Sequence, residues 1–208
     1  MISRPTTVLA AVAATALAGV LGAGPALAQA AAPSPVRAGD VLHRADVADA
    51  FHAAQPVSRH VGTGDGRQAL SACTGETRMR DVVGRHDRIL HGLFTGQIGD
   101  GGAPFDVSEQ IAGRASAAKA TASYRTIVRQ VRACQDVPEG HWYFGRVHRV
   151  STDTGRALWM PTFNGDGTRS GGYAVLVDGA HVGVVDVNAT GSPRRAGRLA
   201  ASALNRLH

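Results

Sequence analysis

The sequence has little that would mark a specialised partner or a membrane protein. Lysine occurs once, as Lys119, among 22 basic residues, and no dense basic run indicates a nucleic-acid partner. Beyond residue 24, no stretch approaches the roughly 18 apolar residues of a transmembrane helix. The formal net charge of +6 is spread along the chain, which is typical of a solvated surface. An anionic ligand or cell-envelope polymer is the alternative reading of that charge.

Motifs of metal binding and of nucleophilic catalysis are incomplete. The nine histidines form no H-E-x-x-H pattern, and Asp166 lies in a segment that lacks the remaining positions of a calcium loop. Ser116 and Lys119 form the S-x-x-K of penicillin-binding enzymes, but the accompanying S-D-N and K-T-G elements are missing, and we expect the motif to lie mid-helix. We therefore expect no catalytic residue, metal or cofactor. A secreted hydrolase of unrecognised type is the alternative.

The N-terminus predicts export. Arg4 precedes the uncharged apolar run Val8–Gly24, and Pro25 is followed by Ala26-Leu27-Ala28, which has the small residues that signal peptidase requires. We place the cut between Ala28 and Gln29. A membrane anchor is the alternative, although a run rich in Ala and Gly is weakly apolar for a bilayer span. The predicted organisation is a signal peptide over 1–28, a flexible tether over 29–38, and one secreted domain without stable membrane insertion over 39–208.

Cysteine is scarce, and the two residues present have a simple interpretation. Cys73 and Cys134 both follow the predicted cut, in a chain expected to reach an oxidising compartment. We expect them to form a disulfide. A metal site is the alternative, but the sequence places no histidine pair near the two thiols.

The first two thirds of the chain predict helices around a few strands. Asp40 can cap a helix that carries Val41, Leu42 and Phe51 among its apolar residues. The glycine-rich segment 60–67 is typical of a flexible loop, and 79–83 and 88–97 have strand character. Asp106 and Glu109 form a D-x-x-E capping box, so a long helix is expected from 106 to about 133.

The remainder predicts strands and a final helix. Alternating apolar residues indicate strands over 142–150, 157–163, 173–177 and 180–187. Asp178-Gly179 is a type I′ hairpin signal between the last two strands. Ser192 and Pro193 begin a C-terminal helix. These elements predict a single α+β domain in which an antiparallel sheet is packed by one long central helix and a C-terminal helix.

Aromatic residues make up only 5% of the chain, yet both tryptophans lie within 18 residues of one another. Packing in the core or on a sheet face is the simpler interpretation. The alternative is a cleft wall suited to an amphipathic ligand. The residues of this predicted cleft are Trp142, Tyr143, Arg146, His148 and Trp159.

The chain resembles the PknH-like extracellular sensor domains of actinobacteria over about residues 40–207. The residues that carry the resemblance are Cys73, Ser108–Ile111, Ala117-Ala118, Tyr124, Val131–Cys134, and the later hairpin 173–187 with the terminal helix. The resemblance implies an antiparallel sheet with packed helices around a cleft, and a monomeric, non-catalytic module that binds an unidentified small-molecule or envelope ligand. Kinase members have two disulfides and a membrane helix, so ligand capture is expected here rather than signalling by the chain itself.

The cysteine analysis predicts that thiol labelling of the unreduced, denatured protein finds no free thiol. Linking residues 73 and 134 should stabilise the fold by roughly 4 kcal/mol through loop closure, so Cys134→Ala should lower the Tm. The same protein treated with a reductant is the positive control for labelling. Two labelled thiols per unreduced chain would contradict the pairing.

Overall fold

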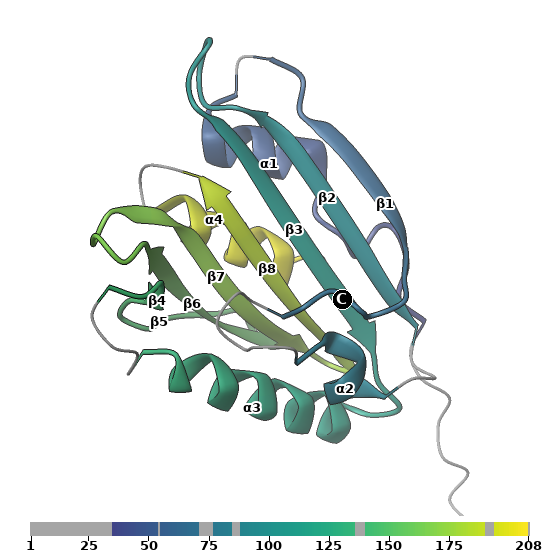
Figure 1. Cartoon of the computed structure of the whole chain (residues 1–208). Helices are drawn as coiled ribbons and strands as arrows, with labels where there is room; N and C mark the ends of the chain where they lie inside the picture. Colours follow the sequence, from purple (N-terminus) through teal and green to yellow (C-terminus); the bar gives the residue numbers. More distant parts are fainter. Residues whose placement is uncertain are drawn as a thin grey trace, which may run out of the picture. The chain divides into compact units, whose positions relative to one another are not determined.

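One antiparallel sheet organises the chain in the computed structural model (Figure 1). The structure describes residues 35–53, 55–70, 77–84, 88–135, 140–189 and 194–207. All of these lie within one unit, Ala31–His208. The sheet order is β1-β2-β3-β8-β7-β6-β4, and β5 also pairs with β6. Two meanders, β1-β2-β3 and β6-β7-β8, therefore meet where β3 pairs with β8.

The strands have the following bounds: β1 Ser58–Gly64, β2 Ile89–Gln97, β3 Pro104–Gly113, β4 Tyr143–Phe144, β5 His148–Ser151, β6 Gly155–Phe163, β7 Arg169–Asp178 and β8 His181–Ala189. Long neighbouring strands pair along most of their lengths; β3, for example, pairs with β8 from Phe105↔Ala189 to Gly113↔His181.

Helices lie on both faces of this sheet. Figure 1 shows α2 (Met79–Val83) and α3 (Ala117–Ala133) in front of the strands, on what we name the front face. It shows α1 (Arg44–Phe51) and α4 (Arg194–Leu204) behind them, on the back face. The α+β fold class predicted from the sequence, with a long helix and a C-terminal helix packed on an antiparallel sheet, is confirmed.

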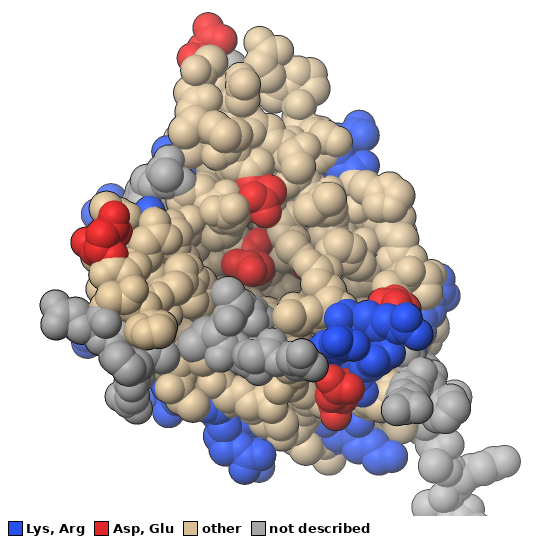
Figure 2. Space-filling model, in the orientation of Figure 1, with Lys and Arg blue, Asp and Glu red and all other residues tan. Residues whose placement is uncertain are grey.

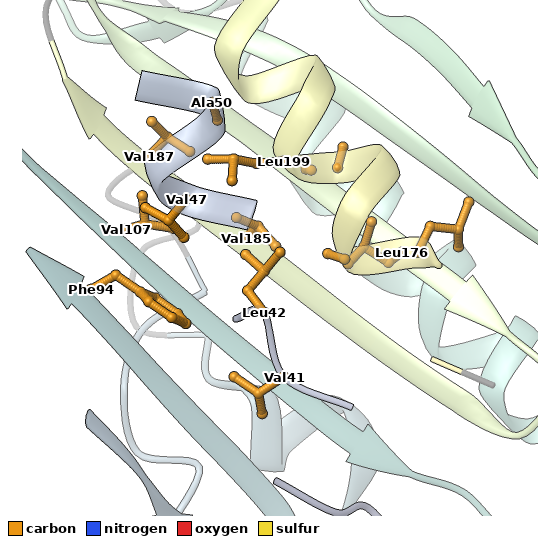
Figure 3. Packing of buried hydrophobic residues seen from close by; sticks show 14 of the residues in the cluster. Val41, Leu42, Val47, Ala50, Phe94, Val107, Leu176, Val185, Val187 and Leu199 are labelled. Carbon is orange, nitrogen blue, oxygen red and sulfur yellow. The ribbon is translucent and has the colours of Figure 1, made fainter. Parts of the chain in front are cut away.

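Each face of the sheet has its own apolar cluster. The back-face cluster joins α1 and α4 to the sheet, and Figure 3 shows Val47, Phe94, Val107 and Leu199 converging there. The front-face cluster joins α3 to residues such as Val175. Side chains alternate between the two faces along each strand. A strand covered on both faces therefore buries nearly every residue, as β7 does from Gly171 to Asp178.

Three local expectations for the first part of the chain were wrong. The first helix begins at Arg44, because Asp46 accepts the N–H of His43 at 2.8 Å and Asp40 instead accepts that of Arg37. Segment 58–64 is the edge strand β1 rather than a loop. Its backbone pairs with β2, and this pairing outweighs the loop tendency of the glycines within the segment. Segment 79–83 is helix α2, whose two buried residues, Met79 and Val83, are one turn apart.

The long helix predicted from Asp106 was also wrong in its first part. Residues 104–113 form β3, which pairs with β2 on one side and β8 on the other. The helix begins only at Ala117, with Ser116 as its N-cap. Pairing on both sides of β3 outweighs the local capping pattern.

The C-terminal part follows the predictions closely. Strands β6, β7 and β8 and helix α4 are confirmed, while the strand expected over 142–150 is divided into β4 and β5. The hairpin loop is shifted by one residue, because Asp178 pairs with His181 and leaves Gly179 and Ala180 in the loop. Only Gly179 of these two has a positive φ, so the turn is not the predicted type I′.

Some predictions fall on residues that the structure does not describe. These are the signal peptide, its cut between Ala28 and Gln29, the tether up to residue 34, Cys73, and the helix start at Ser192 and Pro193. Export, the disulfide and this helix start therefore stay predictions. Cys134 is buried where α3 ends. Val36 is fully buried in the back-face cluster, so packing begins before the expected start at Gly39. Within the described ranges, no helix has the length and apolar character needed to cross a bilayer.

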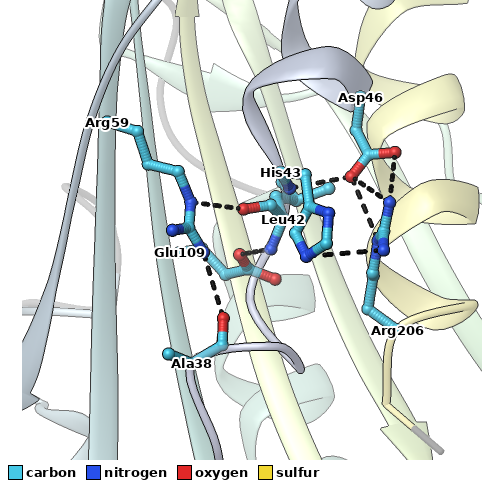
Figure 4. A network of polar contacts seen from close by, with 7 residues as sticks. All are labelled: Ala38, Leu42, His43, Asp46, Arg59, Glu109 and Arg206. Carbon is cyan, nitrogen blue, oxygen red and sulfur yellow. Dashed lines mark hydrogen bonds and ion pairs between the residues drawn. The ribbon is translucent and has the colours of Figure 1, made fainter.

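A buried carboxyl group holds the segment that leads into α1 (Figure 4). Glu109 on β3 is fully buried, and its Oε2 accepts the N–H of Leu42 at 2.8 Å. Its other oxygen, Oε1, has no hydrogen-bond partner. The guanidinium of Arg59 donates to the carbonyls of Leu42 and Ala38 at 2.9 and 3.0 Å. Gly92, which pairs with Glu109, leaves the space that Val41 needs, since a Cβ there would lie 2.6 Å from a Val41 methyl.

The environment of Glu109 favours its neutral form. Burial raises its pKa to about 8, against the smaller opposite effects of the Leu42 N–H and the positive charge of Arg59. Near pH 7 the group is therefore mostly protonated, and it can both accept and donate a hydrogen bond.

A second polar contact ties α1 to the C-terminus (Figure 4). Arg206 donates from Nε and from a terminal nitrogen to the two carboxylate oxygens of Asp46, both at 3.1 Å. Burial pulls the pKa of Asp46 upward, but the hydrogen bonds from Arg206 and His43 outweigh it and leave the pKa below its ordinary value. This bidentate pair fixes α1 against the residues that follow α4.

We expect the titration of Glu109 to lower the free energy of unfolding as the pH rises from about 4.5 to about 8. Over that range the unfolded chain loses the proton while the folded chain keeps it, which favours unfolding by on the order of 4 kcal/mol at pH 8. Glu109→Gln keeps an acceptor for Leu42 and removes this titration. Urea unfolding should show the variant gaining stability over the wild type between pH 5 and pH 8.

The control for that measurement is Asp100→Asn, which removes a carboxylate from an exposed loop position. It should follow the wild type at every pH. A difference between Glu109→Gln and the wild type that is independent of pH would contradict the assignment.

Candidate functional site

Part of the front face carries a row of polar groups on three neighbouring strands. Directly paired residues in an antiparallel sheet share a face, and the register places Ser108, Asp186 and Tyr173 side by side on β3, β8 and β7. Asp106 lies two residues from Ser108 and therefore on the same face. We name these four residues, Asp106, Ser108, Tyr173 and Asp186, the acidic strip.

The apolar clusters assign the acidic strip to the front face. Ala112 and Val184, which share the alternation of Ser108 and Asp186, pack in the front-face cluster, as does Tyr173 itself. Figure 2 shows this face with acidic groups inside a hollowed and otherwise uncharged central area. The basic groups lie towards its edges. The strip is thus a local acidic region on a protein of positive net charge.

Burial and like charge both act on the titratable groups of the acidic strip. Burial raises the pKa of Asp186 to about 6, and the negative charge of Asp106 adds to this rise. The hydroxyl of Tyr173 is fully buried without a hydrogen-bond partner, and its pKa is raised by burial and by the charge of Asp186. Buried polar groups are normally hydrogen-bonded, so the orphaned hydroxyl beside a carboxylate makes the acidic strip the candidate site.

Ser108 of the acidic strip is hydrogen-bonded to two further side chains, those of His91 and Gln68. The Oγ of Ser108 lies 3.1 Å from Nε2 of His91 and accepts from the side-chain amide of Gln68 at 3.2 Å. Burial and the nearby charge of His60 lower the pKa of His91. His91 is therefore neutral at pH 7 and can accept the hydroxyl proton of Ser108.

The structure separates the two indoles of the predicted cleft. Trp142 packs against the front-face cluster, with its ring 4.9 Å from that of Phe144 and its Nε1 donating to Ser170. Trp159 belongs to the back-face cluster, is only 9% exposed, and lies against Gly197 of α4. One cleft between the sheet and the long helix therefore cannot be lined by both indoles.

The other three predicted residues are Tyr143, His148 and Arg146. Tyr143 stacks on Phe163 with centroids 5.1 Å apart, His148 stacks on Trp159 at 4.3 Å, and Arg146 is exposed. Each aromatic contact is made within the sheet's own packing. Ligand contact by any of these residues stays a prediction.

The sequence analysis expected the S-x-x-K motif in the middle of a helix, and this was wrong. The motif lies at the start of α3. Ser116 is exposed and caps the helix, where its Oγ accepts the backbone N–H of Lys119 at 3.3 Å. The hydroxyl thus performs a structural role that an N-cap serine commonly has. Among the described residues, no group of three or more His, Cys, Asp or Glu side chains could hold a metal ion.

Sequence reasoning missed the acidic strip because it assigned Asp106 and Glu109 to a helix cap. The contrary signal was present, since Phe105, Val107 and Ile111 alternate with polar residues at the period of a strand. Asp186 was also detectable, as a single charged residue within the apolar strand 182–187. Only the pairing of β3 with β8 brings these two signals together.

We expect Trp159→Ala to cost about 3–5 kcal/mol in the free energy of unfolding, because it opens a cavity beneath α4. Trp142→Ala should cost less, since Trp142 is only partly buried. Urea unfolding measures both, and acrylamide should quench the fluorescence of Trp142 more than that of Trp159. Equal costs with equal quenching would contradict the separation of the two indoles.

No protein-family model and no curated protein matches the sequence. Among solved structures, the extracellular domain of PknH from Mycobacterium tuberculosis is similar, with a TM-score of 0.60 at 14% sequence identity. The match covers 85% of this chain and 98% of that chain. This likeness shows that the chain has the fold of the PknH extracellular domain.

Proposed function

We propose that the protein is an exported, monomeric, non-catalytic sensor-like domain that binds an extracellular or cell-envelope ligand on the acidic strip. The observation that carries the proposal is the buried hydroxyl of Tyr173, which has no hydrogen-bond partner although the charge of Asp186 on the neighbouring strand acts on it. A ligand that hydrogen-bonds this hydroxyl would remove the cost of leaving it unpaired. The fold shared with an extracellular domain and the predicted signal peptide support the export.

The chemistry of the acidic strip suits recognition. Its groups project from three paired strands, so their spacing is fixed by the sheet ladder and little order is lost on binding. Carboxylate, hydroxyl and phenol oxygens can orient a polar ligand. The surrounding uncharged area in Figure 2 offers contact for less polar parts of the same molecule.

Native mass spectrometry tests the proposal on protein purified from the medium of its own host. We expect the wild-type protein to carry a non-covalent adduct that the double variant Asp186→Asn/Tyr173→Phe lacks. Asp100→Asn is the matched control, because it removes one charge from an exposed loop position and should keep the adduct. An adduct that persists in the double variant, or a wild type with none, would contradict the proposed site.

A hydrolase is the second candidate function, and the hydrogen bond between Ser108 and the neutral His91 favours it. It ranks second because, among the described residues, no carboxylate accepts a hydrogen bond from His91 and thereby orients its ring. Labelling of Ser108 by a fluorophosphonate probe would favour this second candidate over pure binding. Absence of labelling, with the adduct observed, would favour binding.

A further inference from the structure

We propose that the acidic strip takes a primary ammonium group carried on a short apolar chain. This proposal rests on the proposed function and adds the chemical class of the ligand. Three features of the front face carry it: the like charges of Asp106 and Asp186, the orphaned hydroxyl of Tyr173, and the exposed side chain of Leu93.

The negative charges of Asp106 and Asp186 favour a cationic ligand. The chain has 22 basic and 16 acidic residues, yet the register places two carboxylates of adjacent strands together on the front face. The two carboxylates repel each other, and the negative charge of Asp106 therefore contributes to the raised pKa of Asp186. A cation between them replaces this repulsion with two attractions, which are strengthened because Asp186 is partly shielded from water.

The hydrogen-bonding groups favour an ammonium group over a metal ion. A primary ammonium has three N–H donors, and the strip offers oxygen acceptors on Asp106, Asp186 and Tyr173. Calcium instead takes about six to eight oxygen ligands. Within the described ranges, no cluster has even three metal-ligating side chains of the His, Cys, Asp and Glu type.

The apolar part of the ligand is indicated by Leu93. Leu93 is 39% exposed, and no other large hydrophobic residue within the described ranges is as exposed to solvent. Leu93 pairs directly with Ser108, so it lies on the same face and adjoins the acidic strip. An alkyl chain that extends from an ammonium at the carboxylates towards β2 would cover this side chain and remove apolar surface from water.

The test uses hexylammonium as the probe, with two matched analogues that each lack one feature. Hexyltrimethylammonium keeps the charge and the chain without N–H donors, and 1-hexanol keeps the chain without the charge. Titrations of the mature protein followed by NMR at pH 7.5 should show hexylammonium binding at Ser108 and Leu93. We expect at least about tenfold weaker binding of each analogue, which corresponds to about 1.4 kcal/mol.

Variants locate the binding on the protein. Asp186→Asn should weaken hexylammonium binding at least tenfold and Tyr173→Phe should weaken it less, while Asp100→Asn should leave it unchanged. Leu93→Ser should weaken hexylammonium more than methylammonium, because methylammonium has no chain to bury. Thermal unfolding of each variant checks that the domain is folded, and Tyr173→Phe retains the packing of the ring if Asp186→Asn should fail to fold.

The outcomes separate this proposal from the proposed function. Equal binding of 1-hexanol, or no loss of hexylammonium binding in Asp186→Asn, would overturn the ammonium assignment. No binding of hexylammonium, together with a native adduct that depends on Asp186 and Tyr173, would overturn the ligand class and leave the site intact. If neither hexylammonium binding nor the native adduct is observed, the proposed site is overturned as well.

Discussion

The antiparallel pairing of β3 with β8 is the interaction on which the rest of the structure depends. It joins one meander from the first half of the chain to another from the second half, across the long connection that contains α3. Nine residue pairs in unbroken register fix the two halves relative to each other. A slip of one residue would move every side chain of a strand to the opposite face, so this register also decides which groups are buried and which are exposed.

The two faces of β3 carry polar groups in different surroundings. Its odd-numbered residues point to the back face, where Glu109 holds the Leu42 N–H under α1. Its even-numbered residues point to the front face, where Asp106 and Ser108 join the acidic strip. Because Glu109 follows Ser108 directly and successive side chains of a strand point to opposite faces, a buried neutral carboxyl group and an anionic region occur within four residues without competing for the same space.

The electrostatic contrast between the faces has a common physical cause, which is the loss of water. Burial raises the pKa of Glu109 to about 8 and that of Asp186 to about 6. Glu109 meets a backbone donor and stays mostly neutral near pH 7. Asp186 is mostly ionised at that pH and lies beside a second carboxylate. The buried carboxyl group of the back face is therefore held by a donor of the fold itself, whereas the two carboxylates of the front face are the groups on which the ammonium proposal rests.

The sequence by itself determined the elements whose signals are local and the general architecture that follows from them. The alternation of 173–187, the glycine at the hairpin, and the apolar stripe of 194–204 predict β7, β8 and α4, because period and turn chemistry depend on near neighbours. Tertiary structure decided β1 and β3, since pairing with distant strands outweighed glycine in one and a capping pattern in the other. It likewise placed Trp142 and Trp159 on opposite faces, and brought Asp106 and Asp186 together. Residues separated by 80 positions become neighbours only through the strand register, which no local pattern specifies.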